Sequence, residues 1–159
     1  MKLVGYCFAG ILMVLAVVVF TGLPAKAEAG SVRKIEESVL DAKISDKQNR
    51  LAIVFMAAWC APCIDELPTL NKLFKKYKNQ GLEIIGISID LDGPEAIQPV
   101  VSALKIDFPV YWYGENAVEK FALFAIPMMF LVKGGEIVER IHGLRHASFL
   151  DEKFRSFLK

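Results

Sequence analysis

The chain has 159 residues, of which 54% are hydrophobic, and it carries 19 basic against 18 acidic side chains. A formal net charge of +1 leaves no basic field of the kind that binds nucleic acid, so a nucleic-acid partner is not expected. Without the first 27 residues, which contain two lysines and no acid, 132 residues remain with 17 basic and 18 acidic side chains, the size of one domain with a proper core.

An apolar segment opens the chain. Residues 3–23 are apolar almost throughout, and no charge follows until Lys26. Pro24 breaks the pattern, and small residues around Lys26 offer a cleavage site after Ala27, which is typical of a secretory signal peptide. Because the run is long enough to span a bilayer, an uncleaved membrane anchor is the alternative. In both cases we expect residues 28–159 to form a domain outside the cytoplasm.

The chain has three cysteines, and they differ in setting. Cys7 lies in the export segment without a lipobox around it, and we interpret it as a small apolar residue. Cys60 and Cys63 are then the sole cysteines of the exported domain. Linking residues so close in sequence constrains the unfolded chain little, so redox chemistry is favoured over a structural staple.

The first elements of the domain lead to these cysteines. Residues 30–50 begin with apolar residues at roughly helical spacing and end in a polar cluster, which predicts a short helix and a turn. The uninterrupted apolar run Leu51–Ala57 suits a central strand buried on both faces. This strand delivers Trp59 and Cys60 to the carboxyl edge of the sheet, where open α/β sheets usually place their sites.

The motif Trp59-Cys60-Ala61-Pro62-Cys63 stands where this strand gives way to a helical pattern. A helix N-terminus favours a thiolate over a thiol at Cys60. Cys63 lies one turn further on, so the two sulfurs can close a disulfide. Pro62 lacks an N–H and fits the first turn at no cost in hydrogen bonds. The motif therefore predicts a reversible dithiol switch.

Beyond Cys63, an apolar stripe predicts an amphipathic helix that Pro68 should kink and Gly81 should end. Its lysines cluster off the stripe and are interpreted as a solvated face. The later elements follow from apolar runs and turn signals. They are a strand over Leu82–Ile89, a helix that Pro94 opens, a strand over Phe108–Tyr113, a helix over Glu115–Phe124, a hairpin of Met128–Val132 and Ile137–Ile141 around Gly134-Gly135, and a phenylalanine-rich terminal helix covering one sheet face.

The order of these elements resembles the thioredoxin fold: W-C-x-P-C follows an apolar strand, a proline-containing helix comes next, and Ile126-Pro127 opens a Gly-Gly hairpin. The resemblance spans most of residues 32–159. It implies an α/β fold with a central mixed sheet flanked by helices. It also implies that Pro127 is a cis-proline beside the active-site cysteines.

Two departures narrow the resemblance. Thioredoxin keeps a buried aspartate and a paired lysine where this chain has Val54 and Gly86, so that proton-handling pair is absent. The run from Cys63 through Glu66 to Pro68 is similar to the C-x-x-E-x-P of the exported TlpA/ResA/CcmG-like reductases. The stretch Leu91–Tyr113, between the second strand and the proline hairpin, resembles the insertion of those proteins, although their N-terminal extra hairpin is missing.

The residues and the resemblance together give candidate site roles. Cys60 is the expected nucleophile and Cys63 the resolving cysteine. Glu66 shares their helix face, where a carboxylate would raise the thiol pKa and could transfer a proton; the alternative is a solvent-exposed helix glutamate. Pro127 is the expected substrate-docking proline. Expected substrate contacts come from Trp59, Pro62 and the backbone of Ile126, which could add an extended segment as a strand.

The resemblance implies a thiol-disulfide oxidoreductase of the periplasm, soluble after cleavage or anchored to the inner membrane, that reduces protein disulfides. The sequence has no dinucleotide-binding motif, and no cofactor is expected. Electrons would come from a membrane thiol donor of the CcdA/DsbD type. Apocytochrome c is a family-typical substrate, which gives a role in cytochrome c biogenesis.

Three other readings are open from the sequence. The same dithiol could serve an oxidant or isomerase, because direction depends on the reduction potential. Cys60 and Cys63 could bind a metal with His142 and His146, although the spacing is not that of a zinc finger. A non-catalytic thioredoxin-like module is disfavoured because both cysteines are present.

Overall fold

A computed structural model describes residues 30–159. The predicted signal peptide or anchor of residues 1–27, and Cys7 within it, lie outside the described residues. Within residues 30–159, no helix is long and apolar enough to cross a membrane.

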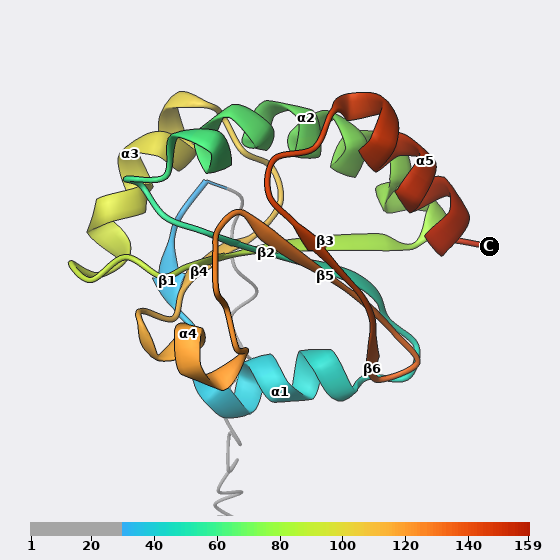
Figure 1. The fold of residues 1–159 in the computed structure, drawn as a ribbon, viewed down its shortest axis with the longest axis horizontal. Coiled ribbons are helices and arrows are strands. Elements are labelled where there is room, and N and C mark those ends of the chain that lie inside the picture. The colour runs from blue at the N-terminus through green and yellow to red at the C-terminus, as the bar shows by residue number, and fades with distance from the viewer. Residues whose placement is uncertain (1–29) are drawn as a thin grey trace, which may run out of the picture.

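The described residues alternate strands and helices around one sheet (Figure 1). The strands are β1 (Arg33–Lys34), β2 (Arg50–Met56), β3 (Leu82–Ser88), β4 (Val110–Trp112), β5 (Met128–Lys133) and β6 (Glu136–His142). The helices are α1 (Glu37–Ser45), α2 (Ala61–Tyr77) followed by a 3-10 turn (Lys78–Gln80), α3 (Pro94–Ala103), α4 (Asn116–Lys120) and α5 (Ala147–Phe157).

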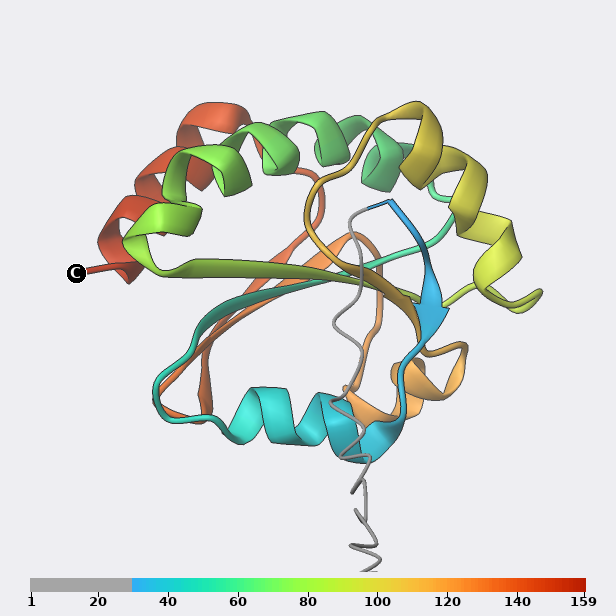
Figure 2. The ribbon, with the colours of Figure 1, turned by 180° about the vertical axis from the view of Figure 1, so that it is seen from behind.

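The sheet is mixed, as predicted, with the strand order β1-β4-β3-β2-β5-β6 in the described part of the chain. Strands β1 to β4 are mutually parallel where they pair, whereas β5 runs antiparallel to β2 and β6 antiparallel to β5. Helices α2, α3 and α5 cover one face, and α1 and α4 cover the other, as the two opposite views show (Figures 1 and 2). The layered arrangement buries the centre of the sheet on both faces.

Strand β2 is the core of this arrangement. Leu51 through Met56 are all buried, because β2 pairs with β3 on one side and β5 on the other while helices cover both faces. The register also sets Val54 beside Gly86, the two positions that the sequence predicts to differ from the thioredoxin pattern. A Cβ at Gly86 would meet the flexible end of the Met56 side chain and the side chain of Val110, so apolar side chains occupy the space beside this position.

The Gly-Gly hairpin is confirmed. Gly134 and Gly135 both have positive φ, 67° and 86°, which the tight turn between β5 and β6 requires and which other residues rarely adopt. A bulge in β6 opposite Leu131 and Val132 shifts the register by one residue along the hairpin.

Other boundaries differ from the predictions. Helix α2 includes the exposed Pro68, and the 3-10 turn that follows it is capped by Gly81, as predicted. The helix expected over Glu115–Phe124 ends at Lys120, and Ala122 takes a positive φ of 50°. The predicted insertion forms α3 and β4, and β4 pairs with the short edge strand β1, which no local pattern indicated.

Candidate active site

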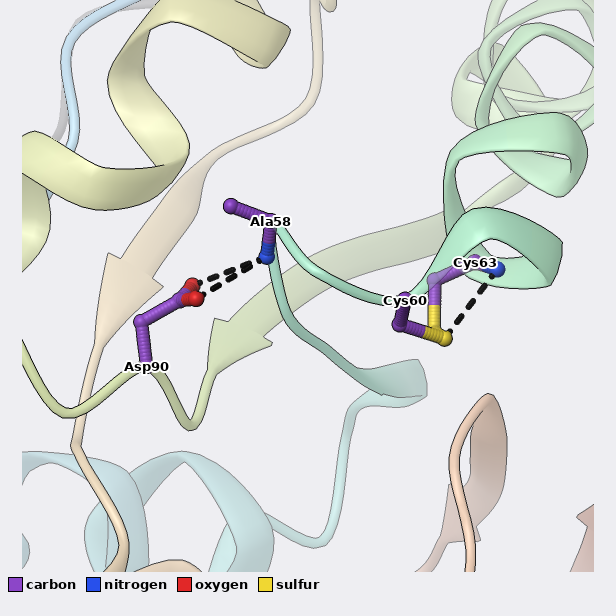
Figure 3. Close-up of a disulfide and its surroundings, with 4 residues drawn as sticks. All are labelled: Ala58, Cys60, Cys63 and Asp90. Atoms are coloured by element: carbon purple, nitrogen blue, oxygen red, sulfur yellow. Dashed lines mark hydrogen bonds between the residues drawn. A yellow bond between two sulfur atoms is a disulfide. The ribbon is translucent and has the colours of Figure 1, made fainter.

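Cys60 and Cys63 form a disulfide at the start of α2, with an S–S distance of 2.04 Å and a Cα–Cα distance of 5.2 Å (Figure 3). Both residues are buried, at 5% and 2% exposed. Cys60 is the N-cap residue of α2, and its Sγ accepts the backbone N–H of Cys63 at 3.3 Å. The predicted position of the dithiol at a helix N-terminus is therefore confirmed.

The residues around the disulfide give the helix its start. Pro62 is exposed and lies in the first turn of α2. Backbone N–H groups in this turn have no carbonyl partner within the helix, so the missing N–H of Pro62 costs no hydrogen bond. The backbone N–H of Ile64 donates to the carbonyl of Cys60 at 3.1 Å and closes the first turn. Positive partial charge at this helix end is directed at Cys60, which favours a thiolate there in the reduced protein.

The peptide bond between Ile126 and Pro127 is cis, as the resemblance implied. Pro127 is buried, Ile126 is half-buried, and the carbonyl of Pro127 accepts the N–H of Gly143 at 2.8 Å. Because β5 pairs Met128 with Phe55, the proline loop lies at the end of β2 that leads to Cys60. The fold therefore brings the two predicted parts of the site to one edge of the sheet.

Glu66 is buried, at 3% exposed, which excludes the solvent-exposed alternative. It lies one turn beyond Cys63 on the buried side of α2. Its Oε1 accepts the backbone N–H of Arg145, from the loop between β6 and α5, at 2.8 Å. Burial raises the pKa of the Glu66 carboxyl, and the N–H and the charge of Arg145 oppose this in part.

This pKa shift makes a prediction for stability. The unfolded chain releases the Glu66 proton near the ordinary value of 4.5, but the folded protein keeps it to higher pH, so stability falls as pH rises through this window. Glu66→Gln keeps an acceptor for Arg145 and removes the charge. We expect the free energy of unfolding of the variant, relative to that of the wild type, to increase as the pH rises from about 4 to neutral. Urea unfolding at a series of pH values measures this difference.

Asp65→Asn is the matched control, because Asp65 is the exposed neighbour of Glu66 on the same helix. It should leave the pH dependence unchanged. Equal pH profiles for wild type and Glu66→Gln would contradict the buried-charge explanation.

A buried carboxylate that the sequence did not single out also lies at this edge of the sheet. Asp90 follows β3 and is 2% exposed. Its two oxygens accept the backbone N–H of Ala58 at 3.0 and 3.1 Å (Figure 3). Ser88, the last residue of β3, and Asp90, two residues further on, are polar residues that follow the apolar run from Ile84 to Ile87 at the carboxyl edge, and they were the signal that could have identified it.

Exposed apolar side chains surround this edge of the sheet. Trp59 follows β2 and is 68% exposed, and Leu91 follows β3. Phe124, 75% exposed, precedes β5, and Leu144 follows β6. Since β5 is antiparallel to β2 and β6 is antiparallel to β5, the start of β5 and the end of β6 lie at the edge where β2 ends, so all four residues lie at the same edge as Cys60. We call these four residues the apolar rim; only Trp59 was predicted from the sequence.

The histidines considered as metal ligands lie at either end of the β6–α5 loop. The His142 ring packs on Phe124 with a centroid distance of 4.6 Å, and His146 is the N-cap residue of α5. Among residues 30–159, no group of three or more histidine, cysteine, aspartate or glutamate side chains is arranged to hold a metal ion.

A disulfide at the first turn of the helix that follows the central strand, with a cis-proline loop at the same edge of the sheet, defines a thioredoxin-like protein. Comparison with known families agrees. The profile of the AhpC/TSA family matches residues 26–141, and the chain belongs to this family.

Curated relatives are thiol-disulfide oxidoreductases. ResA of Bacillus thuringiensis subsp. konkukian is 32% identical over 100 residues, which cover 62% of this chain and 57% of that protein. ResA of Halalkalibacterium halodurans is 31% identical over 108 residues, covering 66% and 60%. The predicted resemblance to ResA-like proteins is thereby confirmed, although the chain matches little more than half the length of these relatives.

Solved structures agree on the fold. A thioredoxin-family thiol:disulfide interchange protein of Chlorobium tepidum aligns with a TM-score of 0.65 at 21% identity, over 75% of this chain and 85% of that one. StoA of Bacillus subtilis aligns with a TM-score of 0.60 at 22% identity, over 69% and 84%. The predicted thioredoxin fold is confirmed.

Proposed function

We propose that this protein is an extracytoplasmic thiol-disulfide oxidoreductase that reduces disulfides in other proteins. The observation that carries the proposal is the Cys60–Cys63 disulfide at the N-terminus of α2, with Cys60 as the helix N-cap. The ResA relatives support the same chemistry.

The reaction begins with the reduced dithiol. The Cys60 thiolate attacks one sulfur of the substrate disulfide, and the other substrate sulfur leaves as a thiolate that takes a proton. Cys63 then loses its proton and attacks the Cys60 sulfur of the mixed disulfide, which releases the second substrate thiol. Two electrons have passed to the substrate, and the Cys60–Cys63 disulfide is the oxidised product.

Glu66 is the proposed proton acceptor for the second step. Its carboxyl is buried on the helix face of Cys63, and burial raises its pKa toward the range in which a carboxylate can exchange protons with a thiol. When charged, it also opposes a second negative charge at the cysteines.

The surroundings of the disulfide favour a protein as the substrate. The apolar rim offers exposed side chains from four separate loops, more than a small thiol such as glutathione could cover. Trp59 and Pro62 border the cysteines, and the Ile126–Pro127 loop lies at the same edge, where its backbone can take an extended segment as a strand.

The remaining parts of the proposal concern place and partners. The apolar segment of residues 3–23 supports export, with the folded domain in the periplasm, either released or tethered to the inner membrane. A reductant there must be reduced again, and a membrane thiol donor of the CcdA/DsbD type would do this. Apocytochrome c, whose haem-attachment cysteines must be reduced, is the proposed substrate.

The reduction potential decides between a reductant and an oxidant. Equilibration of the protein with defined mixtures of reduced and oxidised glutathione, followed by alkylation of free thiols, measures it. A reductant should have a potential at or below about −200 mV, in the range of glutaredoxins and thioredoxin. A value near about −120 mV, as in a strong periplasmic oxidant, would overturn the proposed direction.

A further inference from the structure

Asp90 is a buried carboxylate that contacts residues at the ends of β2 and β3. Both oxygens accept the backbone N–H of Ala58, and Oδ2 also accepts the hydroxyl of Ser88 at 2.7 Å. Ser88 itself is fully buried. A buried carboxylate is costly unless its oxygens are satisfied, so these donors are required to keep it in place.

The backbone of Asp90 is held as firmly as its side chain. Its N–H donates to the Ser88 hydroxyl oxygen at 3.2 Å, and its carbonyl accepts the indole N–H of Trp112 at 2.7 Å. The preceding residue, Ile89, donates its N–H to the carbonyl of Met56 at 2.9 Å. The carboxylate is therefore presented from a turn that is fixed to β2 and β4.

The residue that Asp90 holds begins the loop to the disulfide. Ala58 lies two residues before Cys60, between the end of β2 and the start of α2. The N–H of Cys60 donates to the carbonyl of Ala57 at 3.1 Å, so the loop makes one tight turn around Ala58 (Figure 3). Because Ala58 lies inside this turn, a shift of Ala58 would also move Cys60.

We propose that Asp90 is a positioning residue for the dithiol: its carboxylate fixes Ala58 so that Cys60 stays at the N-terminus of α2 when the disulfide is open. The inference rests on the proposed function. In the oxidised protein the S–S bond itself holds Cys60 close to α2, but in the reduced protein that link is gone. The contact with Asp90 then keeps the thiolate where the helix stabilises it.

The charge of Asp90 and the position that Asp90 imposes on Cys60 would change the pKa of the Cys60 thiol in opposite directions, so an experiment can separate the two effects. A negative carboxylate acting through its charge would raise the thiol pKa, and removal of the charge would lower it. A carboxylate acting through position keeps Cys60 at the helix end, and its removal would raise the thiol pKa. Asp90→Asn keeps an oxygen acceptor for Ala58 and loses the charge, whereas Asp90→Ala loses both.

The test uses the full chain with Cys63→Ser, so that Cys60 is the reactive thiol of the motif. Its rate of alkylation by iodoacetamide is followed against pH by the mass of the peptide that carries it. The same Asp90 variants, with Cys63 intact, are assayed for insulin reduction. Asp92→Ala is the matched control, because Asp92 is an exposed carboxylate of the same turn.

We expect Asp90→Ala to raise the pKa of the Cys60 thiol and to slow insulin reduction about tenfold to a hundredfold, the effect of a small misplacement at a reacting group. Asp90→Asn should stay within about twofold of the Asp92→Ala control in reduction rate, since it keeps the acceptor. Overlap of Asp90→Ala with the control, or a lower thiol pKa in both Asp90 variants, would overturn the positioning role.

Two further measurements keep the test decisive. If circular dichroism shows that Asp90→Ala does not fold, Ser88→Ala, which removes the hydroxyl donor to Oδ2, should raise the thiol pKa in the same direction; no change there would overturn the proposal. If wild-type protein fails to reduce insulin, the proposed function fails, but the alkylation profile of Cys60 still decides the role of Asp90.

Discussion

A Cys60→Ser variant should reduce protein disulfides at least about a thousandfold more slowly than the wild type, because serine cannot supply the thiolate that attacks the substrate. Fold and stability should change little, because Cys60 and Cys63 are only three positions apart in sequence and their bond therefore constrains the unfolded chain little. Turbidity from reduced insulin chains, in the presence of a chemical reductant, measures the rate.

Cys63→Ser is the informative partner of this variant. It keeps the attacking thiolate of Cys60 but cannot resolve the mixed disulfide, so a substrate should stay covalently attached and be released by reductant. Capture from a periplasmic extract, followed by mass spectrometry, identifies it. Recovery of attached protein through Cys63 in a Cys60→Ser variant, and not through Cys60, would reverse the assigned roles.

The largest effect on stability is expected from Phe55→Ala. Phe55 is fully buried in β2, and its ring contacts those of Phe121 and Phe130 at centroid distances of 5.0 and 4.9 Å. Loss of a buried aromatic ring leaves a cavity that costs about 3–5 kcal/mol. Urea unfolding followed by circular dichroism should show a lower midpoint with an unchanged slope.

Phe124→Ala provides the comparison at an exposed phenylalanine. Phe124 is 75% exposed, and its ring packs on His142 at the surface. We expect its stability to stay within about 0.5 kcal/mol of the wild type. A Phe55→Ala protein that is as stable as Phe124→Ala would mean that the core around β2 relaxes to fill the space.

The parts of the fold that depend on residues close together in the sequence could be predicted from it. The run Leu51–Ala57 has no charge and corresponds, one residue displaced, to the central strand β2, in which every residue except Arg50 is buried. The double glycine set the hairpin, because its turn needs two positive φ angles. The start of α2 could be predicted because Pro62 favours the first turn of a helix and the two cysteines flank it.

The features that were missed depend on residues far apart in sequence. Strand β1 has two residues and exists because β4 lies beside it. Asp90 looked like an ordinary turn residue until β3 placed it next to Ala58. Arg145 contacts Glu66 through its backbone N–H, and a side-chain pattern in the sequence does not reveal such a contact. Tertiary contacts decide such positions, and local propensity does not.

The hairpin turn has a practical consequence. Strand β5 starts beside the end of β2 that leads to the disulfide, and Lys133, at its far end, pairs with Arg50 at the start of β2. Gly134 and Gly135 therefore lie about 20 Å from the reactive edge, the length of a six-residue strand. A chemical handle attached at this turn would immobilise the protein on a sensor surface with Cys60 directed toward the solution.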